Sequence, residues 1–405
     1  MNAADTVFII MSSAMVMFMT PGLALFYGGL TRSKNVLGTI MHSFIALGII
    51  TLVWILWGYS LAFGSDIAGL LGGLDFLGLA GVGPQPNPDL AANLPHMVFM
   101  IFQCMFAIIT VALISGGFAE RMKFSTFILF IILWSTFVYS PLCHWVWGGG
   151  WMGELGALDF AGGAVVHMSS GSAALAAALL LGPRKGFGKQ AFIPHNLPMT
   201  ITGAAILWFG WFGFNAGSAL AADGLAANAF VATHIAASTA ALGWLIVEKI
   251  HRGKPTTLGA ASGSVAGLVA ITPAAGFVGP ISALIIGICA GLVCYCGVLL
   301  KEKLAYDDSL DVVGIHGLGG IWGALATGLF ASTAINSGGA DGLFAGNPAQ
   351  LGIQAISILA TCLFTFVATF IILKFLDKTI GLRVSQEEEE QGLDLSLHSE
   401  TGYKF

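Results

Sequence analysis

Residues 5–34 read DTVFIIMSSAMVMFMTPGLALFYGGLTRSK, a long apolar run followed closely by two basic side chains, Arg32 and Lys34. A helix needs about 20 mainly apolar residues to cross the hydrocarbon core of a bilayer, and this run is long enough. It has no basic segment before it and exceeds the length of a signal-peptide core. We therefore expect it to be retained as the first membrane span.

Similar apolar runs follow along the chain, and basic residues occur only in alternate gaps between them. The first five such gaps contain Arg32 and Lys34; Arg121 and Lys123; Arg184, Lys185 and Lys189; Lys249, Arg252 and Lys254; and Lys301 and Lys303. The remaining basic residues, Lys374, Lys378, Arg383 and Lys404, lie at or beyond the last run. Because basic residues stay on the cytoplasmic side during insertion, the alternation predicts eleven transmembrane helices, with the N-terminus outside and the C-terminus inside. The predicted spans are 5–30, 38–63, 95–119, 125–146, 159–182, 196–219, 226–249, 257–273, 279–302, 312–333 and 349–378.

Composition supports the same class, since 56% of the residues are hydrophobic and only 9% are charged, whereas soluble domains are about 25% charged. Runs of this length favour helices over a barrel, whose strands are shorter and alternate. We predict an all-α protein of the cell inner or plasma membrane, with the lipid bilayer around it. Nothing indicates an enzyme domain, a nucleic-acid partner or a cofactor.

The chain divides into a membrane domain, residues 1–380, and an acidic tail, residues 381–405, expected in the cytoplasm. Two Pro- and Gly-containing segments, 64–95 and 334–348, are predicted to be outer loops. The six cysteines show no metal or redox spacing and are expected to be small core residues.

An internal repeat concerns two histidines. Asp159 precedes His167 by eight positions in DFAGGAVVHMSSG, and Asp308 precedes His316 by the same number in DSLDVVGIHGLGG. If the first five spans (about 5–182) repeat as the next five (about 196–333), the odd number inverts the second copy, and the helix at about 349–378 is extra. Inverted repeats commonly place a transport site at their interface. Eight helical residues rise ~12 Å, so the two imidazoles are expected to meet near the middle of the bilayer.

A lone histidine inside a span is more often a satisfied core residue, but two at repeat-related positions favour a function. Charged groups at the bilayer centre are costly, so both rings are expected to be neutral. Each ring then has one donor nitrogen and one acceptor nitrogen. The pair would offer polar contacts along an otherwise apolar path.

Aromatic residues form a second candidate site. Trp211, Phe214 and Ser218 have helical i, i+3 and i+7 spacing near the outer end of the sixth span, and Phe106 and Trp147 are expected at a similar level. Ring faces attract a small cation, and a serine oxygen accepts a hydrogen bond. An aromatic belt at the membrane interface is the alternative explanation.

Several long segments resemble one family. They are FMTPGLALFYGGLTRSKNVL, FAERMKFS, GALDFAGGAVVH, FGKQAFIPHNLP, WFGFNAGS, DVVGIHGLGGIWG and the tail segment GLRVSQEEEEQGLD. Together they resemble the ammonium transporters of the Amt/Mep/Rh family, in matching order over nearly the whole chain.

The resemblance implies a homotrimer in which each subunit has its own pore. It implies that Phe106, Trp147 and Ser218 form an outer ammonium-recruitment site and that Phe106 and Phe214 form a gate. His167 and His316 correspond to the twin histidines of the pore. Asp159 is expected to organise the recruitment site, with Trp211 and Asn215 in supporting roles.

The implied activity is deprotonation of ammonium near the gate, followed by passage of ammonia and a separate net transfer of the proton. An apolar constriction disfavours an unpaired cation, which agrees with this order. The tail resembles a segment that couples subunits and helps to dock a PII-type nitrogen regulatory protein; a disordered acidic tail is the alternative. An ammonium sensor of the same fold, and a passive channel for another small neutral solute, remain alternative functions.

Overall fold

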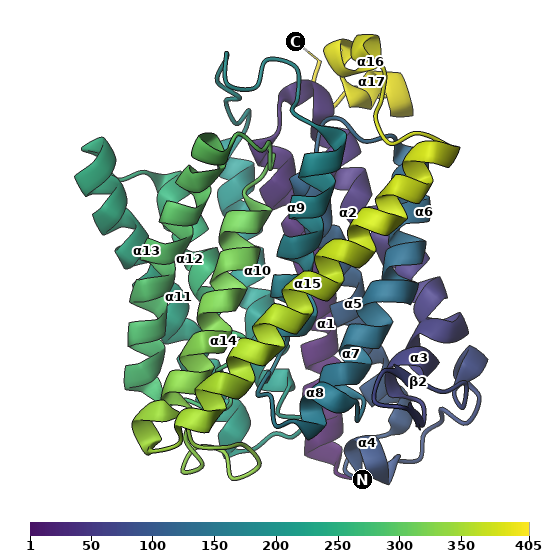
Figure 1. Cartoon of the computed structure of the whole chain (residues 1–405), viewed down its shortest axis with the longest axis vertical. Helices are drawn as coiled ribbons and strands as arrows, with labels where there is room; N and C mark the ends of the chain where they lie inside the picture. The colour runs from purple at the N-terminus through teal and green to yellow at the C-terminus, as the bar shows by residue number, and fades with distance from the viewer. Residues whose placement is uncertain (405) are drawn as a thin grey trace.

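The computed structural model describes residues 1–404, in which most of the chain forms helices that run roughly side by side (Figure 1). Within this range, ten helical segments are long and apolar enough to cross a membrane. They are Ala3–Leu30, Ser33–Phe63, His96–Gly117, Phe124–Glu154, Gly163–Leu181, Leu197–Gly217, Gly224–Arg252, Pro280–Leu304, Val313–Phe330 and Pro348–Thr379. Each overlaps one predicted span.

These segments are built from the following α-helices, in chain order. They are α1 (Ala3–Leu30), α2 (Val36–Val53), α3 (Tyr59–Phe63), α5 (His96–Ile114), α6 (Phe124–Trp134), α7 (Ser140–Trp147), α8 (Trp151–Glu154), α9 (Ser169–Leu181), α10 (Leu197–Gly217), α11 (Gly224–Arg252), α13 (Pro280–Leu304), α14 (Leu318–Phe330) and α15 (Pro348–Thr379). Two π-helical turns interrupt these segments, η2 (Trp54–Gly58) and η5 (Ser135–Tyr139), and two others begin a segment, η6 (Gly163–Met168) and η7 (Val313–Gly317). Short 3₁₀ turns are η1 (Ser33–Asn35), η3 (Leu77–Leu79), η4 (Ser115–Gly117) and η8 (Leu343–Ala345).

The span predicted at 257–273 corresponds to α12 (Thr257–Ile271), which has 15 residues and falls short of the length of the other ten. At 1.5 Å per residue it rises only ~22 Å. Most of it is buried, and so are residues 272–278 that follow it. Protein rather than lipid therefore surrounds α12, which reduces the need for a full apolar length.

The two ends of the chain lie at opposite ends of the helix bundle, and α15 crosses the bundle diagonally (Figure 1). The predicted loop 64–95 contains a small antiparallel pair of strands, β1 (Asp66–Ile67) and β2 (Leu71–Gly72), and the short helix α4 (Pro88–Ala91). The tail forms two short helices, α16 (Gln386–Gln391) and α17 (Leu393–His398). The alternative prediction of a disordered tail is therefore wrong for residues 386–398.

Small residues let the helices approach closely, as expected where lipid gives no hydrophobic drive between helices. The decisive contact is between α9 and η7, because a Cβ added to Gly171 would lie 2.3 Å from the Cα of Gly317. A side chain at position 171 therefore does not fit against the backbone of η7. This contact brings together the two segments that carry His167 and His316.

The prediction that all cysteines are core residues is only partly right. Cys104, Cys143 and Cys294 are buried, Cys289 and Cys362 are partly buried, and Cys296 is exposed. In a membrane protein an apolar run is flanked by lipid as well as protein, so hydropathy alone does not tell which face of a span is the core.

Candidate functional site

A cavity of about 320 Å³ opens between the start of α5, the end of α7 and the end of α10. It is called the outer cavity below because it lies at the end of the bundle that is expected to face outside. It brings together Phe106, Trp147 and Ser218 from three different segments of the chain. The rings of Phe106 and Trp147 meet edge to face, with centroids 5.9 Å apart. The hydroxyl of Ser218 donates to the carbonyl of Phe214 at 2.8 Å, so its oxygen lone pairs remain available to accept hydrogen bonds.

Phe106 and Phe214 close the bottom of this cavity. Their ring centroids are 4.2 Å apart at an angle of 34°, and both side chains are buried. Phe106 lines the outer cavity, whereas Phe214 lines a second, narrow cavity on the other side. The two rings therefore form the wall between the two spaces.

The second cavity, called the lumen below, has a volume of about 10 Å³, close to the minimum that one water-sized molecule needs. Apart from its two histidines and Trp211, its lining is aliphatic or phenyl: Met19, Leu23, Phe26, Ile109, Leu113, Val166, Leu207, Phe214 and Val265. His167 and His316 both lie against it. A cation that entered this lumen would lose most of its hydration without gaining a counter-charge from the lining.

The structure brings the two imidazoles together, as the repeat predicted. Nδ1 of His316 lies 3.2 Å from Nδ1 of His167, and the side chains are only 4% and 1% exposed. Both residues lie in π-helical turns, η7 and η6. A π-helical turn thus contains each histidine, and such turns are often found at functional sites.

Thr272, which follows α12, determines the hydrogen-bonding pattern of this pair. Its hydroxyl donates to the carbonyl of Leu268 at 2.7 Å, and its oxygen accepts from Nε1 of Trp211 at 2.9 Å. Nε2 of His167 lies 3.3 Å from the same oxygen. Because the single hydroxyl hydrogen is already used, Nε2 of His167 donates. In a neutral ring Nδ1 of His167 then accepts, so Nδ1 of His316 donates to it and Nε2 of His316 is left as an acceptor.

Asp159 uses its carboxylate to begin η6. Its two oxygens accept from the backbone N–H groups of residues 162–165, at 2.6–3.3 Å. Its carbonyl oxygen accepts from Nε1 of Trp147 at 2.9 Å. This one residue thus positions both the helix that carries His167 and the tryptophan of the outer cavity. A carboxylate is favoured at this position by the exposed N–H groups of the helix start.

The remaining predicted residues support the site from α10. Trp211 lines the lumen and stacks on His167, with ring centroids 5.4 Å apart. It therefore lies on the inner side of the phenylalanine pair, not in the outer aromatic cluster that its spacing suggested. Asn215 is buried and donates to Oγ1 of Thr233 on α11 at 2.9 Å. It fixes α10 against α11 and lines neither cavity.

Two polar residues of this region were not identified from the sequence. Thr272 follows a short apolar helix and has no distinguishing pattern around it. Gln103 lies on α5 and lines the outer cavity. A polar side chain inside an apolar span is itself a signal, which would have marked Gln103.

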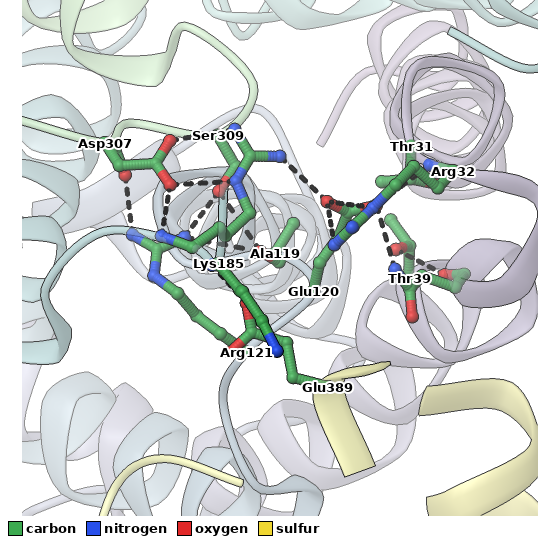
Figure 2. Close-up of polar contacts among 12 residues, drawn as sticks. Thr31, Arg32, Thr39, Ala119, Glu120, Arg121, Lys185, Asp307, Ser309 and Glu389 are labelled. Carbon is green, nitrogen blue, oxygen red and sulfur yellow. Dashed lines mark hydrogen bonds and ion pairs between the residues drawn. The ribbon is translucent and has the colours of Figure 1, made fainter. Parts of the chain in front are cut away.

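A larger cavity of about 830 Å³ opens at the opposite end of the bundle. Beside it, Glu120 lies between Arg32 and the Asp307 region (Figure 2). Arg184, which lines this cavity, binds Glu120 at 2.8 Å and holds Asp307 with two nitrogens, Nη2 and Nε, at 2.8 and 2.9 Å. Burial acts to raise the pKa of Glu120, but Arg184 and Arg32 outweigh it and hold this pKa below its usual value.

The tail is fastened to this same end. Glu389 accepts from the backbone N–H of Lys185 at 2.7 Å and from Arg383 at 2.7 Å, and Figure 2 shows it beside Lys185. Asp394 accepts from the backbone N–H groups of Leu37 and Gly38, at 3.0 and 2.8 Å, at the start of α2. Burial raises the pKa of Asp394, an effect that these backbone donors oppose.

The fold and this arrangement of cavities define a multi-pass membrane protein of the transporter or channel class. The family model for the Ammonium Transporter Family matches residues 7–403, and the chain belongs to this family.

The chain is similar to known ammonium transporters over most or all of their length. The chain is 55% identical to an ammonium transporter of Bacillus subtilis, covering all of this chain and 99% of that protein. It is 49% identical to ammonium transporter Amt1 of Archaeoglobus fulgidus, covering both chains completely. Among solved structures it resembles Mep2 of Saccharomyces cerevisiae, with a TM-score of 0.90, 38% identity, and coverage of 96% of this chain and 88% of that one. It also resembles a sensor Amt protein, with a TM-score of 0.89, 31% identity and 98% coverage of each chain.

Proposed function

We propose that this protein is an ammonium transporter that binds NH₄⁺ in the outer cavity, removes its proton near the phenylalanine pair, and conducts NH₃ past His167 and His316 into the cytoplasm. The released proton passes to water in the outer cavity and is transferred separately. The observation that carries the proposal is the apolar lumen with paired imidazoles directly behind the closed pair of Phe106 and Phe214.

Binding of a cation in the outer cavity is supported by two kinds of group. The rings of Phe106 and Trp147 line one small volume, and a cation over a desolvated ring face is stabilised by about 2 kcal/mol. Ser218 supplies an oxygen whose hydrogen is already donated elsewhere. Potassium has no N–H donors for such an acceptor and no proton to release.

The apolar lining of the lumen explains why ammonium loses its proton before it enters. A charge in an apolar space is far costlier than a neutral molecule of the same size, and the narrow lumen leaves little room for accompanying water. Neutral ammonia needs only local hydrogen bonds, and Nε2 of His316 is positioned as an acceptor by the chain of bonds through His167 and Thr272.

We infer eleven membrane spans with α12 as the eighth, a five-plus-five inverted repeat followed by α15, the N-terminus outside, and a homotrimer in the plasma membrane. The opposite positions of the termini and the buried α12 support the odd number of spans. The matching π-turns at the two histidines support the repeat. Native mass spectrometry and protease access to the tail in sealed vesicles test the trimer and the orientation.

The decisive experiment measures ammonium-evoked current in proteoliposomes for the wild type, His167→Ala and His316→Ala. The wild type should carry current that saturates with ammonium and is absent with potassium. Both variants should lose most of it. Equal currents in all three proteins would remove the histidine pair from the mechanism.

A sensor function is the second candidate, because the chain also resembles a sensor Amt protein. A sensor would bind ammonium in the outer cavity without carrying current at rates above an empty-liposome control. A passive channel for another neutral solute would carry that solute equally well when Ser218 is changed to alanine, since a neutral solute does not use a cation site.

We further propose that residues 381–405 form a regulatory tail that couples the subunits and helps to dock a PII-type protein. Support comes from the contacts of Glu389 with Lys185 and of Asp394 with the start of α2, at the end of the bundle that holds the larger cavity. Asp394→Asn is the mildest test, because it keeps the chain length. If PII inhibits transport to the same extent in the wild type, in Asp394→Asn and in a chain lacking residues 381–405, this role is contradicted.

A further inference from the structure

We propose that Gln103 is a second oxygen ligand of the cation in the outer cavity, acting together with Ser218 and determining its affinity. This inference rests on the proposed function and deepens it by naming one more residue of the same binding site.

Gln103 belongs to the face of α5 that lines the outer cavity. Phe99, Gln103 and Phe106 follow one another at i, i+4 and i+7, and all three line this cavity. Gln103 therefore sits one turn of helix from Phe106, on the side away from the lumen. Ser218 and Trp147 line the same space. The only carboxylate in the lining is Asp89, which is exposed at the rim.

The amide of Gln103 is buried without a partner for its oxygen. The residue is only 9% exposed. Among residues 1–404, its Oε1 is shielded and has no hydrogen-bond partner. Buried polar atoms are nearly always paired, and leaving one unpaired costs more than replacing it with an apolar group of the same shape. A leucine or methionine would fill this position without that cost, so the unpaired oxygen points to a ligand.

Ammonium provides what this oxygen lacks. It has four N–H donors in a tetrahedral arrangement, and a ring face, a serine oxygen and an amide oxygen can engage different ones. The last torsion of a glutamine side chain is broad, so a partial rotation of the amide turns the oxygen toward the cavity that the side chain lines. Hydrogen bonds to charged donors are the strong ones, which is why the cation rather than ammonia is the preferred partner.

Three variants test the proposal: Gln103→Leu, Gln103→Glu and Ser218→Ala. The measurement is the ammonium chloride concentration that gives half-maximal current in proteoliposomes, with size-exclusion profiles as the check on folding. Gln103→Leu removes the oxygen at similar volume and is expected to raise this concentration about tenfold. Gln103→Glu keeps the shape and adds a negative charge, so it is expected to lower the concentration above the pH at which the carboxyl ionises.

The direction in which Gln103→Glu shifts the half-maximal ammonium concentration distinguishes a cation ligand from a side chain that only fills space. If Gln103 only fills space, the leucine variant leaves the concentration unchanged, and this result overturns the proposal. Weaker binding in both variants overturns it as well, because a carboxylate in contact with the cation must strengthen binding. Ser218→Ala distinguishes the levels of failure. If it weakens binding while Gln103→Leu does not, only the present inference fails; if neither matters, the cation site of the proposed function fails too.

Discussion

Replacing Thr272 by valine removes one oxygen atom on which two buried donors converge, Nε1 of Trp211 and Nε2 of His167. The bond from Trp211 joins α10 to the end of α12 at 2.9 Å, and both side chains are at most 2% exposed. Hydrogen bonds between membrane helices contribute ~0.6 kcal/mol on average and at most ~1.7 kcal/mol. Since this one is short and fully buried, we expect a value of roughly 1–1.7 kcal/mol.

A double-mutant cycle isolates that value. Trp211→Phe removes the donor, so Thr272→Val should cost roughly 1 kcal/mol less in the phenylalanine background than in the wild type. The space left by the smaller ring is common to both backgrounds and cancels. The assay is reversible unfolding in mixed micelles for all four proteins. Independent sites add to within about 0.5 kcal/mol, so a smaller difference would refute the shared role of this oxygen.

The same variants have distinct effects on transport. Thr272→Val releases Nε2 of His167, so the tautomer of the pair is no longer fixed, and the maximal ammonium current should fall. Trp211→Phe keeps the bond between His167 and Thr272 and should reduce the current less. Equal losses would indicate that ring packing, not the tautomer, is what matters.

Three further changes test the fold around the site. Gly171→Ala should destabilise the protein by about 1–3 kcal/mol and lower the current, because the new methyl would lie 2.3 Å from the backbone of Gly317; Gly48→Ala, which meets nothing within 4 Å, is the matched control and should not destabilise. Asp159→Ala should cost about 1–2 kcal/mol as a lost helix cap, with Asp159→Asn between it and the wild type in thermal unfolding. Glu120→Gln should cost about 1–3 kcal/mol, because it removes one of the two buried carboxylates that pair with Arg184 and leaves only Asp307. Since the pKa of Glu120 is held below its usual 4.5, the wild-type advantage is fully present above that pH and shrinks as pH falls through the lower folded value, and a constant difference in acid would contradict this.

The sequence was most informative where chemistry repeats along the chain. The equal Asp-to-His spacings predicted that His167 and His316 meet, and the structure places their Nδ1 atoms 3.2 Å apart. Apolar length predicted the positions of the spans because the bilayer imposes it. Of the three residues that helical spacing placed near the outer end of the sixth span, only Ser218 lines the outer cavity, whereas Trp211 and Phe214 line the lumen.

What the sequence did not indicate depends on contacts between distant segments. Thr272 acts through Trp211 and His167, which come from other helices, so its neighbours in the chain carry no trace of its role. Helical spacing correctly placed Trp211 on the same face of α10 as Phe214. It does not show that Phe106, from α5, packs on Phe214 and separates Trp211 from the outer cavity. The ion pairs of Glu120 likewise join three loops, and only folding brings them together.

The π-helical turns at the two histidines have a consequence for how the chain tolerates change. Each residue advances an ordinary helix by about 100°, so a π-turn behaves as a one-residue insertion that rotates everything on one side of it relative to the other. Both η6 and η7 are π-turns, and each precedes the regular helix of its span. Deleting a single residue from either turn would restore a regular helix and swing one imidazole away from its partner, although every side chain of the site would still be present. The alignment of the two rings is thus encoded in the length of the chain as much as in its chemistry.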